Sequence, residues 1–195
     1  MAAANFTNIV DFMIMMPLGP QMMRVFSIEP SEFSLLVASY SISAGISGFS
    51  GVFYMDRLDR KKALLGVYFG FLLGTLACAF APTYETLLAA RALTGVFGGV
   101  ISSVIMAIIG DVFPDSKRGR AMGVTMASFS IASVVGVPFG LYLANEFTWQ
   151  APFLLLAGIG VPVYVAMTFL IPEVKSHLSK DIPRQTPLQD LTSML

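Results

Sequence analysis

The stretch that decides the fold runs from Ala151 to Phe169 and reads APFLLLAGIGVPVYVAMTF, without a charged residue. A helix needs roughly 18 or more nearly uncharged residues to cross a bilayer. Inside lipid the backbone polar groups must be paired within the protein, which leaves a helix or a strand of a closed barrel. Barrel strands alternate polar and apolar residues over about ten positions, and this stretch does not alternate. It therefore predicts a transmembrane helix.

Other uncharged runs of similar length lie along the chain. The quoted residues belong to a run from Phe147 to Pro172, and the other runs are Phe33 to Met55, Ala63 to Tyr84, Ala92 to Gly110 and Ala121 to Asn145. A further run, Met1 to Met23, is interrupted only by Asp11. We therefore predict an all-α membrane protein in which residues 1–172 form a bundle of six transmembrane helices. The expected spans are 4–26, 33–55, 63–83, 86–110, 121–145 and 149–172.

The composition also indicates a chain surrounded by membrane lipid. Hydrophobic residues make up 55% of the 195 residues, charged residues only 12%, and the formal net charge is zero. Soluble domains carry about 25% charged residues, so disorder, collagen and a basic nucleic-acid-binding domain are excluded. Cys78 is the single cysteine and His177 the single histidine. We therefore expect no metal site, no cofactor, no nucleic-acid partner and no enzymatic activity.

Basic residues indicate which ends of the spans face the cytoplasm. They follow the second, fourth and sixth expected spans, whereas the opposite connections hold only Arg24. The residues in the first group are Arg57, Arg60, Lys61, Lys62, Lys117, Arg118, Arg120, Lys175, Lys180 and Arg184. Because basic residues collect in cytoplasmic loops, we expect a protein of the cell (inner) membrane with both termini in the cytoplasm. Residues 173–195 are predicted to be a cytoplasmic linker that carries either the start of an amphipathic helix or a frayed tail.

Small residues recur at every fourth position in several expected spans, which lets helix backbones approach closely. The fifth span carries Ser128, Ala132, Gly136, Gly140 and Ala144, and the second carries Ser39, Ser43, Ser47 and Gly51. Such rows pack either inside the six-helix bundle or against a second bundle, and the sequence leaves both open. Pro17 and Pro20 in the first span and Pro138 in the fifth either interrupt a helix beside a substrate cavity or are tolerated kinks.

Two ionisable residues, Asp11 and Arg91, lie within the expected spans. A charge near the bilayer centre costs about 2.5 to 3.5 kcal/mol on insertion scales, so each is a candidate functional residue. The long stem of Arg91 can reach the nearby outer interface, which the short Asp11 cannot. Burial favours a protonated carboxyl, so Asp11 is a candidate proton-binding site; the alternative is an interfacial carboxylate near the inner surface. The two residues start from opposite membrane surfaces, which leaves open whether they pair.

The loop after the second span resembles a motif of the major facilitator superfamily of secondary transporters. Gly51 and the hexapeptide from Asp56 to Lys61 resemble the Asp-Arg-x-Gly-Arg-Lys signature, with Asp59 in place of the usual second glycine. The resemblance implies the N-terminal six-helix half of that fold, with three-plus-three inverted repeats. It assigns Gly51, Asp56, Arg57, Arg60 and Lys61 to a cytoplasmic gate.

Three further motifs resemble the same family, and specifically its drug and sugar efflux branch. Arg91 with Gly95 and Gly99 is similar to the fourth-span motif that the family links to proton coupling. Gly136, Pro138 and Gly140 resemble the fifth-span motif of antiporters. Asp11-Phe12 with the segment from Pro17 to Pro20 resembles the first span of the efflux branch.

Together the motifs imply proton-coupled export of small organic molecules by alternating access, with a C-terminal six-helix half as partner. Asp11 would bind the proton, and Arg91 would shift the pKa of Asp11. The segment from Gly136 to Gly140 and the small-residue rows of the second and fifth spans would meet the other half. Candidate residues of the substrate cavity are Met13, Met16, Pro17, Gln21 and Tyr40. The alternatives are a six-span half-transporter that works as a homodimer with a second copy, and a membrane interaction or assembly protein that transports nothing.

Overall fold

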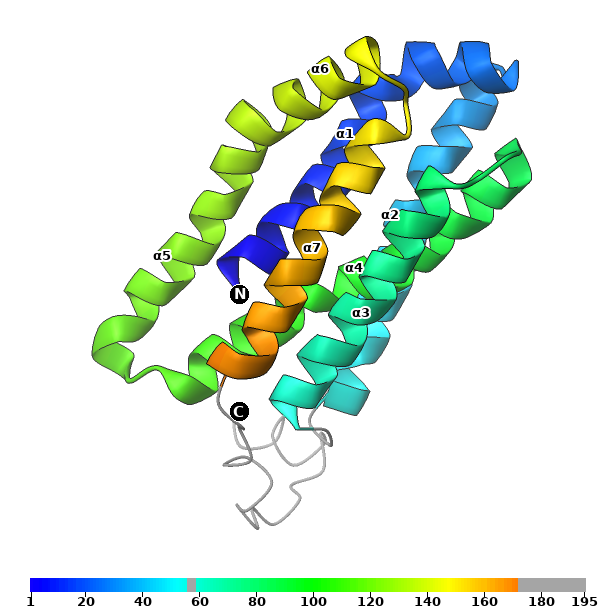
Figure 1. Cartoon of the computed structure of the whole chain (residues 1–195). Helices are drawn as coiled ribbons and strands as arrows, with labels where there is room; N and C mark the ends of the chain where they lie inside the picture. Colours follow the sequence, from blue (N-terminus) through cyan, green and yellow to red (C-terminus); the bar gives the residue numbers. More distant parts are fainter. Residues whose placement is uncertain (56–58, 172–195) are drawn as a thin grey trace, which may run out of the picture.

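The computed structural model describes residues 1–55 and 59–171, and these form a bundle of membrane-length helices (Figure 1). The elements are α1 (Ala2–Phe26), α2 (Pro30–Met55), α3 (Arg60–Ala79), α4 (Tyr84–Val112), α5 (Asp115–Ile131), the π-helical turn η1 (Ala132–Gly136), α6 (Val137–Glu146) and α7 (Ala151–Leu170). Because α5, η1 and α6 follow one another without a break, they act as one span. The bundle therefore has six helices, as predicted. The linker expected at 173–195, like Asp56 and Arg57, lies outside the described residues.

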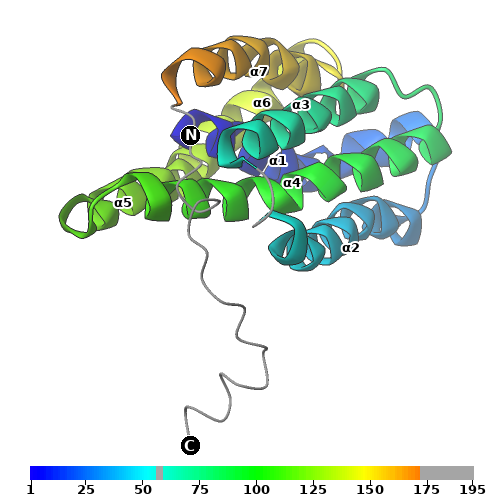
Figure 2. The ribbon, with the colours of Figure 1, turned by 90° about the horizontal axis from the view of Figure 1, so that it is seen from below.

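The helices run up and down through the bundle. The connections after α1, α3 and α6 lie at one end, and the end of α2, the start of α3 and the connection after α4 lie at the other (Figure 1). Seen from below, α3 and α7 lie on one side and α2 on the other, with α1 and α4 between them (Figure 2). Five spans are long and apolar enough to cross a membrane within the described part of the chain, and α1 is not among them. Its lower hydropathy follows from the buried polar residues Asn5, Thr7, Asn8 and Asp11.

The helix ends follow from local capping. Asp59 precedes α3 and its carboxylate accepts hydrogen bonds from the backbone N–H groups of Lys61 and Lys62. Thr83 forms a capping box with Thr86 at the start of α4, so α3 ends at Ala79 instead of reaching residue 83. The fifth span begins at Asp115, earlier than expected, because the charged residues before 121 form its first turns.

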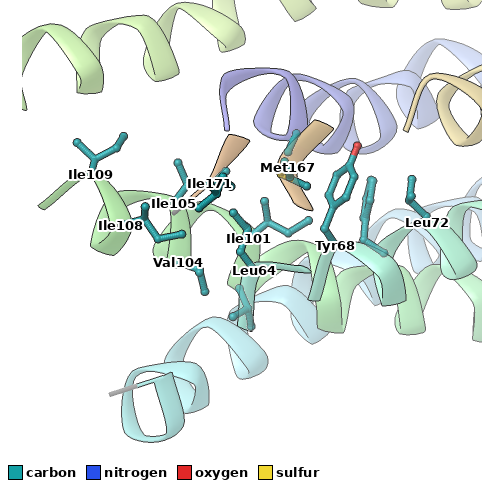
Figure 3. Close-up of a cluster of buried hydrophobic side chains, with 13 residues drawn as sticks. Leu64, Tyr68, Leu72, Ile101, Val104, Ile105, Ile108, Ile109, Met167 and Ile171 are labelled. Atoms are coloured by element: carbon teal, nitrogen blue, oxygen red, sulfur yellow. The ribbon is translucent and has the colours of Figure 1, made fainter. Parts of the chain in front are cut away.

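An apolar core joins α3, α4 and α7 at the lower half of the bundle (Figure 3). Its side chains include Leu64 and Tyr68 from α3, Ile101 and Ile105 from α4, and Met167 from α7. A second cluster at the other end contains Ile14 and Leu18 of α1 together with Trp149 and Phe153. The two clusters hold α1 and α4 in place along their length.

The glycines in the small-residue row of the fifth span pack inside the bundle, whereas Pro138 of the same motif is exposed. A Cβ on Gly136 would meet Val10, and one on Gly140 would lie 2.7 Å from Ile14 Cδ1. Both glycines therefore face α1, as does Ser128, whose hydroxyl donates to the Ala2 carbonyl at 3.0 Å. Small size at these positions serves the close approach of α1 to the fifth span.

The row in the second span flanks a close crossing of α2 with α4. Its members Ser39, Ser43, Ser47 and Gly51 are half-buried. At the crossing itself, a Cβ on Gly95 would overlap the backbone of Tyr40, and one on Gly99 would overlap the backbone of Ala44. The glycines of α4 thus set the distance between these helices, and of the second-span row Gly51 packs against Val100 of α4.

The prolines affect the first and fifth spans differently. The first span stays α-helical through Pro17 and Pro20, so the prolines do not interrupt it. The fifth span changes to a π-helical turn directly before Pro138. π-Helical turns inside α-helices are uncommon and often lie at functional sites.

Candidate functional site

A buried ion pair joins α1 to α4 at the centre of the bundle. Arg91 Nη1 donates to Asp11 Oδ2 at 2.8 Å and to the Asp11 backbone oxygen at 3.4 Å. The second carboxylate oxygen, Asp11 Oδ1, accepts from the Thr75 hydroxyl of α3 at 3.2 Å. The side chains of both charged residues are at most 1% exposed. The pair therefore connects three helices without contact with solvent.

The observed pairing decides two alternatives that the sequence left open. Asp11 is fully buried, so it is not an interfacial carboxylate. Arg91 is fully buried as well, and its guanidinium turns to Asp11 instead of reaching for the outer surface. Two opposite charges that are paired and hydrogen-bonded avoid most of the penalty for a charge buried alone.

Tyr40 of α2 completes the surroundings of the arginine. The Arg91 Cζ atom lies 4.6 Å from the centre of the Tyr40 ring, a cation–π arrangement. The Tyr40 hydroxyl donates to Asn8 Oδ1 at 2.8 Å, and Asn8 Nδ2 donates to the Gly98 carbonyl at 3.1 Å. All four helices from α1 to α4 thus contribute to one polar cluster of Asp11, Tyr40, Thr75 and Arg91, with Asn8 behind it.

Asn8 and Thr75 were not predicted from the sequence as members of this cluster. A signal was present, because Asn5, Asn8 and Asp11 are spaced three residues apart and so lie along one side of α1. Asn5 continues the polar line toward the lower end, where it donates to the Thr125 carbonyl and accepts from the Ser102 hydroxyl. An uninterrupted line of polar residues in a membrane helix predicts contact with other helices, not with lipid.

The candidate cavity residues divide into two groups. Met16 of α1 is 63% exposed, and Met13, Pro17 and Gln21 are half-buried on the same side of the helix. Gln21 also donates to the Ala144 carbonyl at 3.1 Å. Tyr40 is only 5% exposed in this six-helix bundle, and its place in a cavity wall stays a prediction. Its ring is held between Arg91 and the phenyl ring of Phe12.

The described part of the gate motif forms contacts at the lower end of the bundle. Arg60 Nε donates to Asp111 Oδ2 at 3.3 Å, which joins the start of α3 to the end of α4. Asp59 caps α3, which gives a structural use to the residue that replaces the family's glycine. Gly51 packs against Val100, and Lys61 lies in the first turn of α3. Asp56 and Arg57 lie outside the described residues.

The fourth-span and fifth-span motifs are packing motifs in this structure. Gly95 and Gly99 make the close contact of α4 with α2, and Gly136 and Gly140 make that of the fifth span with α1. Pro138 is exposed on the opposite side of its helix. Across residues 1–55 and 59–171, no group of three or more His, Cys, Asp or Glu side chains is placed to hold a metal ion.

Comparison with known proteins gives consistent matches. The family model of the Major Facilitator Superfamily matches residues 1–195. The multidrug efflux pump LfrA of Mycolicibacterium smegmatis is 34% identical over 142 residues, which are 72% of this chain and 27% of LfrA. The vacuolar membrane amino acid uptake transporter fnx2 of Schizosaccharomyces pombe is also 34% identical over 142 residues, which are 72% of this chain and 23% of fnx2. The chain spans about a third of the length of the curated relatives it matches.

A solved structure has the same fold. The inward-open conformation of the xylose transporter XylE from E. coli superposes with a TM-score of 0.80 at 15% identity. The superposition covers 92% of this chain and 48% of the XylE chain.

Proposed function

Because the chain belongs to the Major Facilitator Superfamily, we propose that it is the N-terminal six-helix half of a proton-coupled transporter that exports small organic molecules. The short coverage of its longer relatives supports the assignment to one half. The missing partner is then a C-terminal six-helix half. In this proposal both termini of the chain lie on the cytoplasmic side of the cell (inner) membrane, which the basic residues of the lower connections support.

The observation that carries the proposal is the buried pair of Asp11 and Arg91. A proton that binds Asp11 neutralises the carboxylate and weakens its bond to the arginine. The contact between α1 and α4 then loses its ionic part, and the cluster that joins the first four helices loosens. Alternating access needs such a change between two arrangements of the helices around a central site. Proton binding at Asp11 would therefore bias the equilibrium between these arrangements.

The chemistry of the exposed side of α1 supports small, largely apolar substrates. Met16 and Phe12 are exposed there, with Met13 half-buried beside them. Methionine side chains are flexible and polarizable, and so adapt to ligands of different shapes. The name of LfrA, a multidrug efflux pump, agrees with export of such molecules. The name of fnx2 describes uptake, so the proposed direction depends on the efflux-type motifs of the first and fifth spans.

Exposed apolar side chains of α2 and of the fifth span supply surfaces for the other half. Ile42, Ile46 and Phe49 are between 59% and 73% exposed on α2. Val134 and Phe139 are 74% and 50% exposed in the fifth span. These side chains, and not the buried glycine rows, would meet the C-terminal helices, and Asp56 and Arg57 would belong to the cytoplasmic gate.

The test is proton-driven transport by the complete protein in proteoliposomes. We expect Asp11→Asn to abolish the dependence of export on the proton gradient while binding of the substrate persists. Asp115→Asn is the control, because Asp115 also belongs to an ion pair but is exposed and pairs with Arg118 within α5. Unchanged proton dependence in Asp11→Asn would refute the proposed coupling. The mass of the protein in mild detergent then distinguishes a single twelve-helix chain from a dimer of six-helix chains.

A further inference from the structure

Tyr40 has a defined position between α1 and α4 that the proposed function does not use. Its ring faces the Arg91 guanidinium at 4.6 Å, and its hydroxyl donates to Asn8 at 2.8 Å. Asn8 in turn donates to the Gly98 carbonyl at 3.1 Å, so the ring is tied to both neighbouring helices.

Tyr40 packs directly against glycines of α4. A Cβ on Gly98 would overlap the Tyr40 hydroxyl and would lie 2.8 Å from Asn8 Oδ1. A Cβ on Gly95 would overlap the Tyr40 backbone. The Phe12 ring closes the other side, with its centre 5.2 Å from that of Tyr40. The ring therefore cannot turn away from Arg91 unless α2, α4 or α1 moves.

The hydrogen bonds of Arg91 show what remains when its partner is neutralised. Two hydrogen bonds leave the guanidinium from Nη1, and both end on Asp11. The buried Nε atom has no hydrogen-bond partner. The titratable groups that face Arg91 are Asp11 from α1, Tyr40 from α2 and Cys78 from α3. Once Asp11 carries a proton, Arg91 keeps its bond to the Asp11 backbone oxygen and its contact with Cys78, and the electron-rich face of Tyr40 is the large apolar surface that still attracts the cation.

We propose that Tyr40 is a positioning residue that holds Arg91 in place when Asp11 is protonated, with Asn8 fixing the ring. This inference rests on the proposed function, in which Asp11 takes up the proton. The ring stabilises the unpaired cation more than the paired one, because the carboxylate already neutralises the pair. Tyr40 thereby favours proton uptake at Asp11 without touching the proton or the substrate.

The first experiment measures how export depends on proton concentration for the complete protein in proteoliposomes. We expect Tyr40→Leu to raise the proton concentration needed for half-maximal export about thirtyfold, as follows from the strength of a desolvated cation–π contact. Tyr40→Phe keeps the ring, and should restore most of this loss. Tyr68→Leu is the matched control, because Tyr68 is fully buried and its hydroxyl pairs with Thr7 of α1 at 3.0 Å. It should leave the proton dependence unchanged.

The second experiment is independent of transport and measures the melting temperature of the purified protein in detergent. Tyr40→Leu should lower the melting temperature more in the Asp11→Asn background than in the parent, since the ring then holds Arg91 without help. Tyr68→Leu should lower it equally in both backgrounds. Equal effects of Tyr40→Leu in the two backgrounds would overturn the role of Tyr40. Export by Asp11→Asn could still depend on the proton gradient while Tyr40→Leu lowers the melting temperature more in the Asp11→Asn background. In that case the proposed coupling fails, while the contact of Tyr40 with Arg91 stands.

Discussion

Replacing Arg91 with methionine should leave Asp11 buried without its cation. In the parent protein both carboxylate oxygens accept hydrogen bonds, from Arg91 at 2.8 Å and from Thr75 at 3.2 Å. Only the Thr75 hydroxyl remains in the variant. Removal of one partner from a buried ion pair destabilises a protein by about 3 to 5 kcal/mol. The methionine itself fills most of the space of the arginine stem, so the electrostatic part should dominate.

Proton uptake by Asp11 sets an upper limit on this electrostatic loss. An ordinary aspartate has a pKa of about 3.9, and each pH unit above it adds about 1.4 kcal/mol to the free energy of keeping the carboxyl protonated. The limit is therefore about 4 kcal/mol at pH 7 and about 1.5 kcal/mol at pH 5. Because the carboxyl ionises freely in the unfolded chain, the variant should lose stability as the pH rises from 5 to 7.

The assay is thermal unfolding of the complete protein in detergent at pH 5 and pH 7. We expect Arg91→Met to be much less stable at pH 7 than at pH 5, relative to the parent. Addition of Asp11→Asn should recover most of the loss at pH 7, because no buried charge then remains. Arg118→Met is the control, since Arg118 is half-exposed and pairs with the exposed Asp115, where a surface pair contributes little. A double variant as unstable as Arg91→Met, or an equal loss at both pH values, would refute the argument.

Two further predictions concern packing and capping. Gly99→Ala should destabilise the protein by about 1 to 3 kcal/mol, because the added Cβ overlaps the backbone of Ala44 and no side-chain rotation relieves it; thermal unfolding measures this. Gly66→Ala is its control: a Cβ there meets nothing within 4 Å, so the better helix propensity of alanine should stabilise α3 slightly, and equal effects of the two variants would contradict the α2–α4 crossing. Asp59→Ala should destabilise by about 1 kcal/mol because two backbone N–H groups of α3 lose their acceptor. Amide hydrogen exchange in the first turn of α3 should then be faster in the variant than in the parent, while exchange in the first turn of α4 should not change. Equal changes in both turns would argue against the cap.

The six-helix architecture could be predicted because long runs without charged residues identify membrane helices. The charge-free stretch from Ala151 to Phe169 lies entirely within α7. Helix ends were less predictable, since α4 and the fifth span extend into charged or polar turns beyond the apolar run. Hydropathy alone would also have missed α1, whose buried face is polar. It was found only because the run from Met1 to Met23 holds a single charge.

The use of the small-residue rows could not be predicted from their spacing. Spacing by four residues places Gly136 and Gly140 on one face of a helix but does not say which helix that face meets. In the structure they meet α1, and apolar side chains such as Val134 face outward instead. A glycine row and an exposed valine are both compatible with a helix contact, so only the packed structure separates them.

The meeting of Asp11 with Arg91 depends on rotation of the helices as well as on depth. At 1.5 Å per residue, Asp11 lies about 14 Å from the start of α1 and Arg91 about 10 Å from the start of α4, which begins at the other end. Depth therefore brings both residues toward the middle without joining them. What joins them is that Asn5, Asn8 and Asp11 lie within about a third of the circumference of α1, and that Asn8 and Asp11 both contact the face of α4 that carries Arg91 and Gly98. A line of polar residues on one helix here meets a glycine-lined face on another. The two helices can then approach closely, and the buried polar groups find hydrogen-bond partners. This combination is why a charged pair can exist at the centre of this bundle.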